Sequence, residues 1–235
     1  MKRLAVIIPG ILTPEDLAKK IDHMMSFVSP DTEVQAFLFS GTTRSIKVGG
    51  DVSLLAGETR DIAIKVEKLG FDALVIHGIC DFGIEAARGA VSIPVVGLGS
   101  ATFHLACQLA DHFGVVTKSD ATIPEFSRRI KLMGCFEYIT SMRALNVPET
   151  DLLYKSDEVT GKFIDIARYQ IEHEGAQLIV AGYSAILGVL PAGSREIFEQ
   201  KLGVPVIDGV PVALKTAEML VDLKVSQSRL TYPQA

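Results

Sequence analysis

The chain has 235 residues, of which 48% are hydrophobic and 22% charged, and its formal net charge is -5. These values are typical of a globular protein with a sizeable core. They argue against nucleic acid or an anionic membrane as a partner, because there is no basic surplus to neutralise phosphates. No stretch approaches the roughly 18 apolar residues of a membrane span, so we expect a cytoplasmic protein.

Strand-like and helix-like segments alternate along the chain. Short apolar runs predict strands at 4–9, 33–39, 71–77, 93–98, 114–117, 143–147, 178–181 and 204–207. Helical periodicity predicts helices after the cap residue Thr13 and at 54–69, 84–90, 101–113, 124–133, 156–174, 194–201 and 210–223. Repeated strand–helix units indicate an α/β fold with largely parallel sheets covered by helices.

Two parts of the sequence resemble each other. Residues 70–78 can be laid on 175–183 without a gap, and 92–97 similarly match 203–208. This likeness predicts two similar lobes related by a pseudo-twofold, although any two strand–helix–strand units share some of these features.

We place lobe 1 at residues 1–97 plus 207–235 and lobe 2 at 98–206. Ligands of open α/β sheets bind outside the carboxyl ends of the strands. The active site is therefore expected in the cleft between the lobes, where two equivalent strand ends would face each other.

Several segments in a fixed order carry a family resemblance. They read GFDALVIHG, DFGIEAARGAVSIPVVGLGSATFHLA, FGVVT, SMRALNVPETDL, GAQLIVAGY, LGVPVIDGVPVALKTAEMLV and SRLTYPQA. With these segments the chain resembles the hydantoin and allantoin racemases of the aspartate/glutamate racemase superfamily. The resemblance implies a homo-oligomer and cofactor-independent chemistry on a small carboxylate or a cyclic amide.

In that family two cysteines, one from each lobe, remove and deliver a proton on opposite faces of a carbon next to a carbonyl. Here the position of the first cysteine aligns with Gly78, and that of the second with Tyr183. Both thiols of the family pattern are therefore displaced or absent.

Three residues are candidates for the catalytic role. Cys80 lies two residues beyond the aligned position; it could supply the thiol, or it could be an unreactive cysteine beside the opposing charge of Asp81. Tyr183 could donate a proton, or it could only bind substrate or fill the wall of the cleft. His77 could be a base, or strand alternation could bury it as a structural histidine.

The substrate-binding candidates lie in loops that follow predicted strands. They are Pro9, Gly10, Ser40, Gly78, Ile79, Thr117, Lys118, Ser119, Gly182 and Ser184. For the stretch 117–119 a helix-capping loop is an equally good interpretation. We expect Cys107 in the core and Cys135 in a surface loop, and no ligand-like spacing indicates a metal.

Three functions remain open at this point. A racemase or epimerase agrees with the resemblance, whereas the altered thiol pair argues against it. A cofactor-free decarboxylase of the arylmalonate type needs only one proton donor. A repurposed small-molecule-binding protein would keep the cleft without the acid–base pair.

Overall fold

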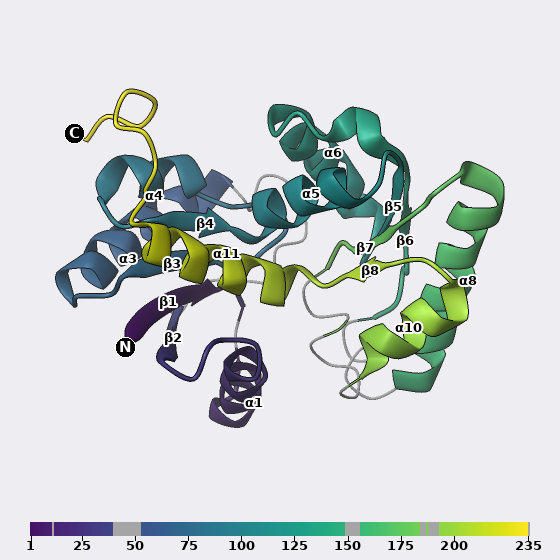
Figure 1. Ribbon diagram of the computed structural model, residues 1–235, viewed down its shortest axis with the longest axis horizontal. Coiled ribbons are helices and arrows are strands. Elements are labelled where there is room, and N and C mark those ends of the chain that lie inside the picture. The colour runs from purple at the N-terminus through teal and green to yellow at the C-terminus, as the bar shows by residue number, and fades with distance from the viewer. Residues whose placement is uncertain (11, 40–52, 149–155, 184–186, 188–192, 235) are drawn as a thin grey trace. The chain divides into compact units, whose positions relative to one another are not determined.

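The computed structural model of the chain describes residues 1–10, 12–39, 53–148, 156–183, 187 and 193–234 (Figure 1). The chain forms two compact units. Unit 1 comprises Met1–Ala101 with Val210–Ala235, and unit 2 comprises Thr102–Gly209. Each unit contains a four-stranded parallel sheet with helices packed on it. The predicted α/β class with parallel sheets is confirmed.

The sheet of unit 1 has the strand order β2-β1-β3-β4. Its strands are β1 (Lys2–Ile8), β2 (Thr32–Leu38), β3 (Ala73–Ile76) and β4 (Val95–Gly97). Its helices are α1 (Pro14–Met25), α3 (Ala56–Lys68), α4 (Ile84–Ala90) and α11 (Gly209–Leu223). The predicted cap is present, since the Thr13 side chain accepts a hydrogen bond from the backbone N–H of Asp16.

The sheet of unit 2 has the corresponding order β6-β5-β7-β8. Its strands are β5 (Phe113–Thr117), β6 (Ile139–Ala144), β7 (Ile179–Ala181) and β8 (Val206–Ile207). The helices are α5 (Leu98–Leu109), which starts in unit 1, α6 (Ile123–Leu132), α8 (Ser156–Glu174) and α10 (Ser194–Leu202). Two 3-10 helices, η1 (Asp120–Thr122) and η2 (Phe136–Tyr138), flank α6.

The two sheets share one topology, in which the second strand of the unit is at an edge, beside the first, followed by the third and fourth. The segments matched within the sequence lie on corresponding strands. Residues 70–78 and 175–183 contain β3 and β7, and 92–97 and 203–208 contain β4 and β8. The internal likeness thus extends to strand order.

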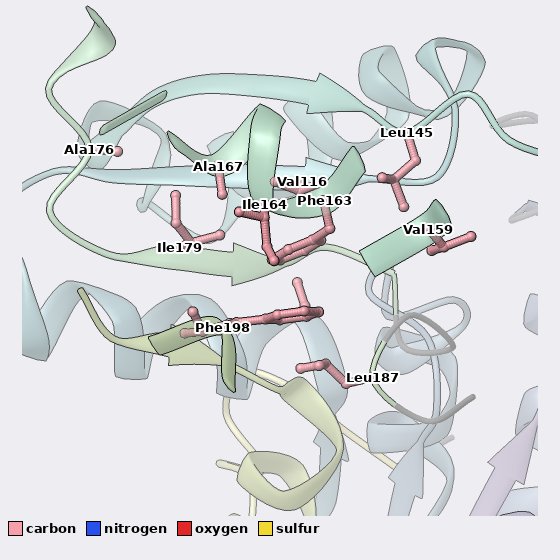
Figure 2. Packing of buried hydrophobic residues seen from close by; sticks show 12 residues of the cluster. Val116, Leu145, Val159, Phe163, Ile164, Ala167, Ala176, Ile179, Leu187 and Phe198 are labelled. Atoms are coloured by element: carbon pink, nitrogen blue, oxygen red, sulfur yellow. The ribbon is translucent and has the colours of Figure 1, made fainter. Parts of the chain in front are cut away.

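The core of unit 2 is an apolar cluster between its sheet and two helices (Figure 2). Phe163 of α8 stacks on Phe198 of α10, with ring centroids 4.6 Å apart and planes 16° from parallel. Val116 of β5 and Ile179 of β7 add the sheet side of the cluster. Large aromatic and β-branched side chains of this kind supply most of the burial that stabilises such a unit.

The sixth strand differs from its prediction. The sequence predicts a strand at 143–147, whereas β6 runs over Ile139–Ala144 and pairs with β5 from Phe113 onward. β6 is an edge strand whose residues are all half-buried. Its polar residues, Thr140, Ser141 and Arg143, interrupt the apolar run that indicates the other strands in the sequence.

The C-terminal segment after α11 lies along the edge of β4. The side chain of Gln227 accepts a hydrogen bond from the Val95 N–H and donates to the carbonyls of Val91 and Ile93. An edge strand exposes unpaired backbone groups, so this segment protects β4 from pairing with another chain. Among the helices of the described residues, none is long and apolar enough to cross a membrane.

Candidate active site

In unit 2, the ends of β5 and β7 bring together five of the predicted residues. β5 and β7 pair in parallel with Val116 opposite Ala181, and the Gly182 N–H donates to the Val116 carbonyl at 2.8 Å. Two residues further along each strand lie Lys118 and Tyr183. The Lys118 ammonium nitrogen lies over the Tyr183 ring, 5.2 Å from its centroid.

Thr117 and Ser119 take mainly structural roles at the same strand end. Thr117 is fully buried, and its hydroxyl lies 3.3 Å from that of Thr122. The Ser119 side chain accepts a hydrogen bond from the Ala121 N–H and so caps η1. For Ser119 the helix-capping interpretation describes the observed contacts.

In unit 1, the equivalent strand end is closed by an aromatic ring. A Cβ atom placed on Gly78 would lie 2.5 Å from Cε1 of Phe82, which is closer than real Cβ contacts. Phe82 itself is fully buried and packs near Phe39, with centroids 5.6 Å apart. Gly78 therefore cannot be replaced by cysteine unless Phe82 moves.

The loop after Gly78 is tied to the start of α5 by Asp81. The buried Asp81 carboxylate accepts hydrogen bonds from the Gly99 N–H at 2.7 Å and the Ser100 N–H at 2.8 Å. Burial raises the pKa of Asp81 to about 6, although the hydrogen bonds from Ser100 and Gly99 oppose the rise. A negative group at a helix N-terminus is also stabilised by the helix dipole.

Two glycines allow this loop to approach α5. A Cβ atom on Gly97 would collide with the carboxylate of Asp81, and one on Gly99 with the carbonyl oxygen of Ile79. Asp81 also has a left-handed backbone with φ of 47°, which Asp tolerates better than most residues. The GLGS stretch thus accommodates the loop that carries Ile79 and Cys80.

Cys80 is 6% exposed within this loop. The Cys80 thiol is covered in this conformation. Because Asp81 fixes the loop through α5, the position of Cys80 depends on Asp81.

His77 packs into an apolar environment. Its imidazole lines a small gap with Met24, Val75 and Leu214, among other apolar side chains. Burial, together with the positive charge of Lys20, lowers the pKa of His77 to about 3. A neutral, weakly basic histidine in such surroundings fits the structural interpretation better than the role of a base.

The remaining predicted residues are less informative. Pro9 and Gly10 follow β1 and are half-buried, and Gly10 has a φ of 103°. Ser40 and Ser184 lie outside the described residues.

Two sulfur positions differ from expectation. Cys135, expected in a surface loop, is buried, whereas Cys107 is half-buried. Burial raises the pKa of Cys135 to about 12, and a hydrogen bond with Cys107 adds to this effect. Within the described part of the chain, no group of three His, Cys, Asp or Glu side chains could hold a metal ion.

Sequence reasoning missed the part that Asp81 plays. In the sequence Asp81 stands out only as a charge beside Cys80, whereas its carboxylate accepts hydrogen bonds from backbone N–H groups 18 and 19 residues away. The pair of glycines in GLGS could have indicated this contact in the sequence, because glycines at the start of a helix let another segment of the chain approach closely.

Each unit is therefore an α/β fold with a parallel sheet, and in folds of this class ligands bind at the loops that follow the carboxyl ends of the strands. The sequence profile of the Asp/Glu/Hydantoin racemase family matches residues 10–217. The chain belongs to this family.

Three similar proteins show how far the likeness extends. A hydantoin racemase of Pseudomonas sp. (strain NS671) is 32% identical, over 99% of this chain and 92% of its own. The structure of allantoin racemase from Klebsiella pneumoniae has a TM-score of 0.87 at 26% identity, covering 100% of this chain and 95% of that chain. A liganded mutant of arylmalonate decarboxylase has a TM-score of 0.70 at 17% identity, covering 94% and 93%, and shares the fold.

Proposed function

We propose that the protein is a cofactor-independent isomerase that moves a proton at a carbon next to a carbonyl. The substrate class is a small carboxylate or a cyclic amide such as a hydantoin. The observation that carries the proposal is the similarity to a hydantoin racemase over nearly the whole length of both chains. A related fold alone would not support an activity, because one fold hosts many functions.

The proposed mechanism uses one group from each strand end. The Cys80 thiolate takes the proton, so that the C–H bond breaks and its electron pair forms an enolate. Tyr183 then gives its phenol proton to the opposite face of that carbon. Donors placed near the developing enolate oxygen are worth several kcal/mol in such reactions, typically about 3, and positioned acid–base groups add about 10²–10⁴-fold in rate.

A decarboxylase is the second candidate, and the packing of Gly78 favours it. At this position the ring of Phe82 fills the space that a thiol would need. A decarboxylase breaks a C–C bond, releases carbon dioxide and leaves an enolate that a single donor protonates. Tyr183 alone would satisfy this requirement.

Incubation of candidate substrates in D₂O, followed by NMR and polarimetry, tests the proposal. An isomerase exchanges the α-proton for deuterium while optical activity is lost. Release of carbon dioxide with incorporation of one deuterium would instead support the decarboxylase. Binding without either reaction, across hydantoins and small carboxylates, would support a protein that only binds its ligand.

The part of Cys80 is tested with Cys80→Ala and Cys80→Ser. Loss of a proton-transferring thiol should lower kcat by about 10²-fold or more. Full activity of Cys80→Ala would exclude the thiol mechanism. A comparison with Cys107→Ala, a half-buried cysteine on α5, controls for the general effect of removing a thiol.

A further inference from the structure

Lys118 and Tyr183 form a cross-strand pair at the carboxyl edge of the sheet. β5 and β7 are neighbours in parallel register, with Val116 opposite Ala181. Lys118 and Tyr183 each lie two residues beyond that pair, just past the ends of their strands, where their side chains meet. The 5.2 Å separation of the ammonium nitrogen and the ring centroid agrees with this register.

The surroundings of Tyr183 make this contact electrostatically important. Its ring packs against the apolar cluster that includes Phe163, Phe198 and Val206. The half-buried Lys118 places a positive charge against the Tyr183 ring. A cation over an aromatic face is attracted more strongly when the ring carries the negative charge of a phenolate.

We propose that Lys118 is a positioning residue that stabilises the phenolate form of Tyr183, so that the pair is the proton-transferring group of unit 2. This inference rests on the proposed function. When Tyr183 protonates the enolate, the phenol O–H bond breaks and the enolate electron pair forms the new C–H bond. The negative charge then passes to the phenolate, whose ring lies 5.2 Å from the Lys118 ammonium nitrogen.

The corresponding positions in unit 1 have no such groups. β1 and β3 pair with Ile7 opposite Ile76, so the residues two positions further are Pro9 and Gly78. Neither of these can donate or accept a proton through its side chain. The assignment of the pair to unit 2 therefore follows from register as well as from contact.

Ultraviolet titration measures the ionisation of Tyr183 directly. The chain has five tyrosines and no tryptophan, so phenolate absorbance dominates the change, and subtraction of a Tyr183→Phe titration isolates one residue. Lys118→Met should move the Tyr183 step to higher pH by about one unit or more. Lys118→Arg keeps a cation and should restore the step to within a few tenths of a unit of its wild-type position. The other tyrosines serve as an internal reference.

Lys131→Met is the matched control, since Lys131 also lies over an aromatic ring of unit 2, that of Phe136, which has no hydroxyl. It should leave the Tyr183 step unchanged. If Lys118→Met also leaves the step unchanged, the inference is wrong whatever the activity. If the step moves but no substrate exchanges its α-proton, the proposed function fails while the pairing of Lys118 with Tyr183 stands.

Turnover provides the second measurement. Lys118→Met should lower kcat about tenfold with a smaller change in KM, because a phenolate is stabilised only as the proton leaves. Lys118→Gln repeats the test with a polar side chain of similar length. If both variants instead raised KM about tenfold and left kcat unchanged, Lys118 would be assigned to substrate binding, which would contradict its proposed effect on Tyr183.

Discussion

The strand ends of β3 and β7 occupy the same place in two sheets of the same topology, yet their chemistry differs. After β7, Tyr183 is half-buried and lies under the ammonium of Lys118. After β3, Gly78 is closed by the ring of Phe82, and the following loop is tied down by a buried carboxylate. The same backbone fold can therefore carry different side chains at its two equivalent strand ends. The end of β3 is filled by an apolar ring, and the end of β7 carries ionisable groups.

The largest expected effects come from breaking the packed strand end. Phe82→Ala should lower the free energy of unfolding by about 3–5 kcal/mol, because it removes a fully buried ring. Gly78→Ala should cost about 1–3 kcal/mol through overpacking. Urea unfolding measures both variants.

A variant with both Gly78→Ala and Phe82→Ala shows whether the two losses of stability arise from the same contact. In the Phe82→Ala background, Gly78→Ala should cost much less, because the colliding ring is gone. Gly57→Ala on α3 is the control, since a Cβ there meets nothing within 4 Å. Strict additivity of the Gly78 and Phe82 effects would contradict the packing described for this strand end.

His77 should make unit 1 sensitive to acid. Its folded pKa of about 3 lies below its usual value of 6.5, so between these values only the unfolded chain takes up the proton. The contribution of His77 to stability should then fall as the pH falls, by about 2 kcal/mol at pH 5. His77→Leu should remove this contribution, so that stability rises as the pH falls from 6 to 4 because of the buried Asp81, as measured by urea unfolding from pH 7 to 4. A variant with the same pH dependence as the wild type would show that His77 is solvated.

Asp81 should act in the opposite direction. Its folded pKa of about 6 lies above the usual 3.8, so stability is lost as the pH rises from about 4 to 6, by about 2–3 kcal/mol in total. Asp81→Asn should remove this loss, so that only the effect of His77 on the pH dependence of stability remains. In the wild type the two effects nearly cancel between pH 4 and 6, so a steep rise of stability with pH there would contradict the assignment of Asp81, and a steep fall that of His77.

The smallest effect on stability is expected at the strand end that carries Tyr183. Tyr183→Phe keeps the ring on the apolar cluster and loses only a hydroxyl, so unfolding should change by less than about 1 kcal/mol. The same variant should reduce proton exchange by about 10²-fold or more under the proposed mechanism. A large loss of stability would instead make Tyr183 a structural residue like Phe82.

The succession of strands and helices and the fold class could be predicted because they depend on local signals. Alternating apolar runs and helical periodicity indicate βα units, and the likeness of 70–78 to 175–183 matches corresponding strands. β6 was misplaced, because a half-buried edge strand lacks a continuous apolar run.

The site was predicted only in part, because its decisive contacts are not local. The hydrogen bonds of Asp81 with Gly99 and Ser100 join a loop to a later helix. The blocked Gly78 depends on the direction of the Phe82 side chain, which spacing does not reveal. The register of Lys118 and Tyr183 follows only once β5 and β7 are known to be neighbours.

The discontinuous course of unit 1 also affects how the chain matures during synthesis. The carboxylate of Glu218 on α11 accepts hydrogen bonds from the Ser29 N–H and the Thr32 hydroxyl, and Gln227 covers β4. These contacts cannot form until the ribosome has made Glu218 and Gln227. Unit 2 is one continuous segment that precedes them and can close first, so the nascent chain keeps the edge of β4 open to chaperones and to mispairing until Gln227 emerges.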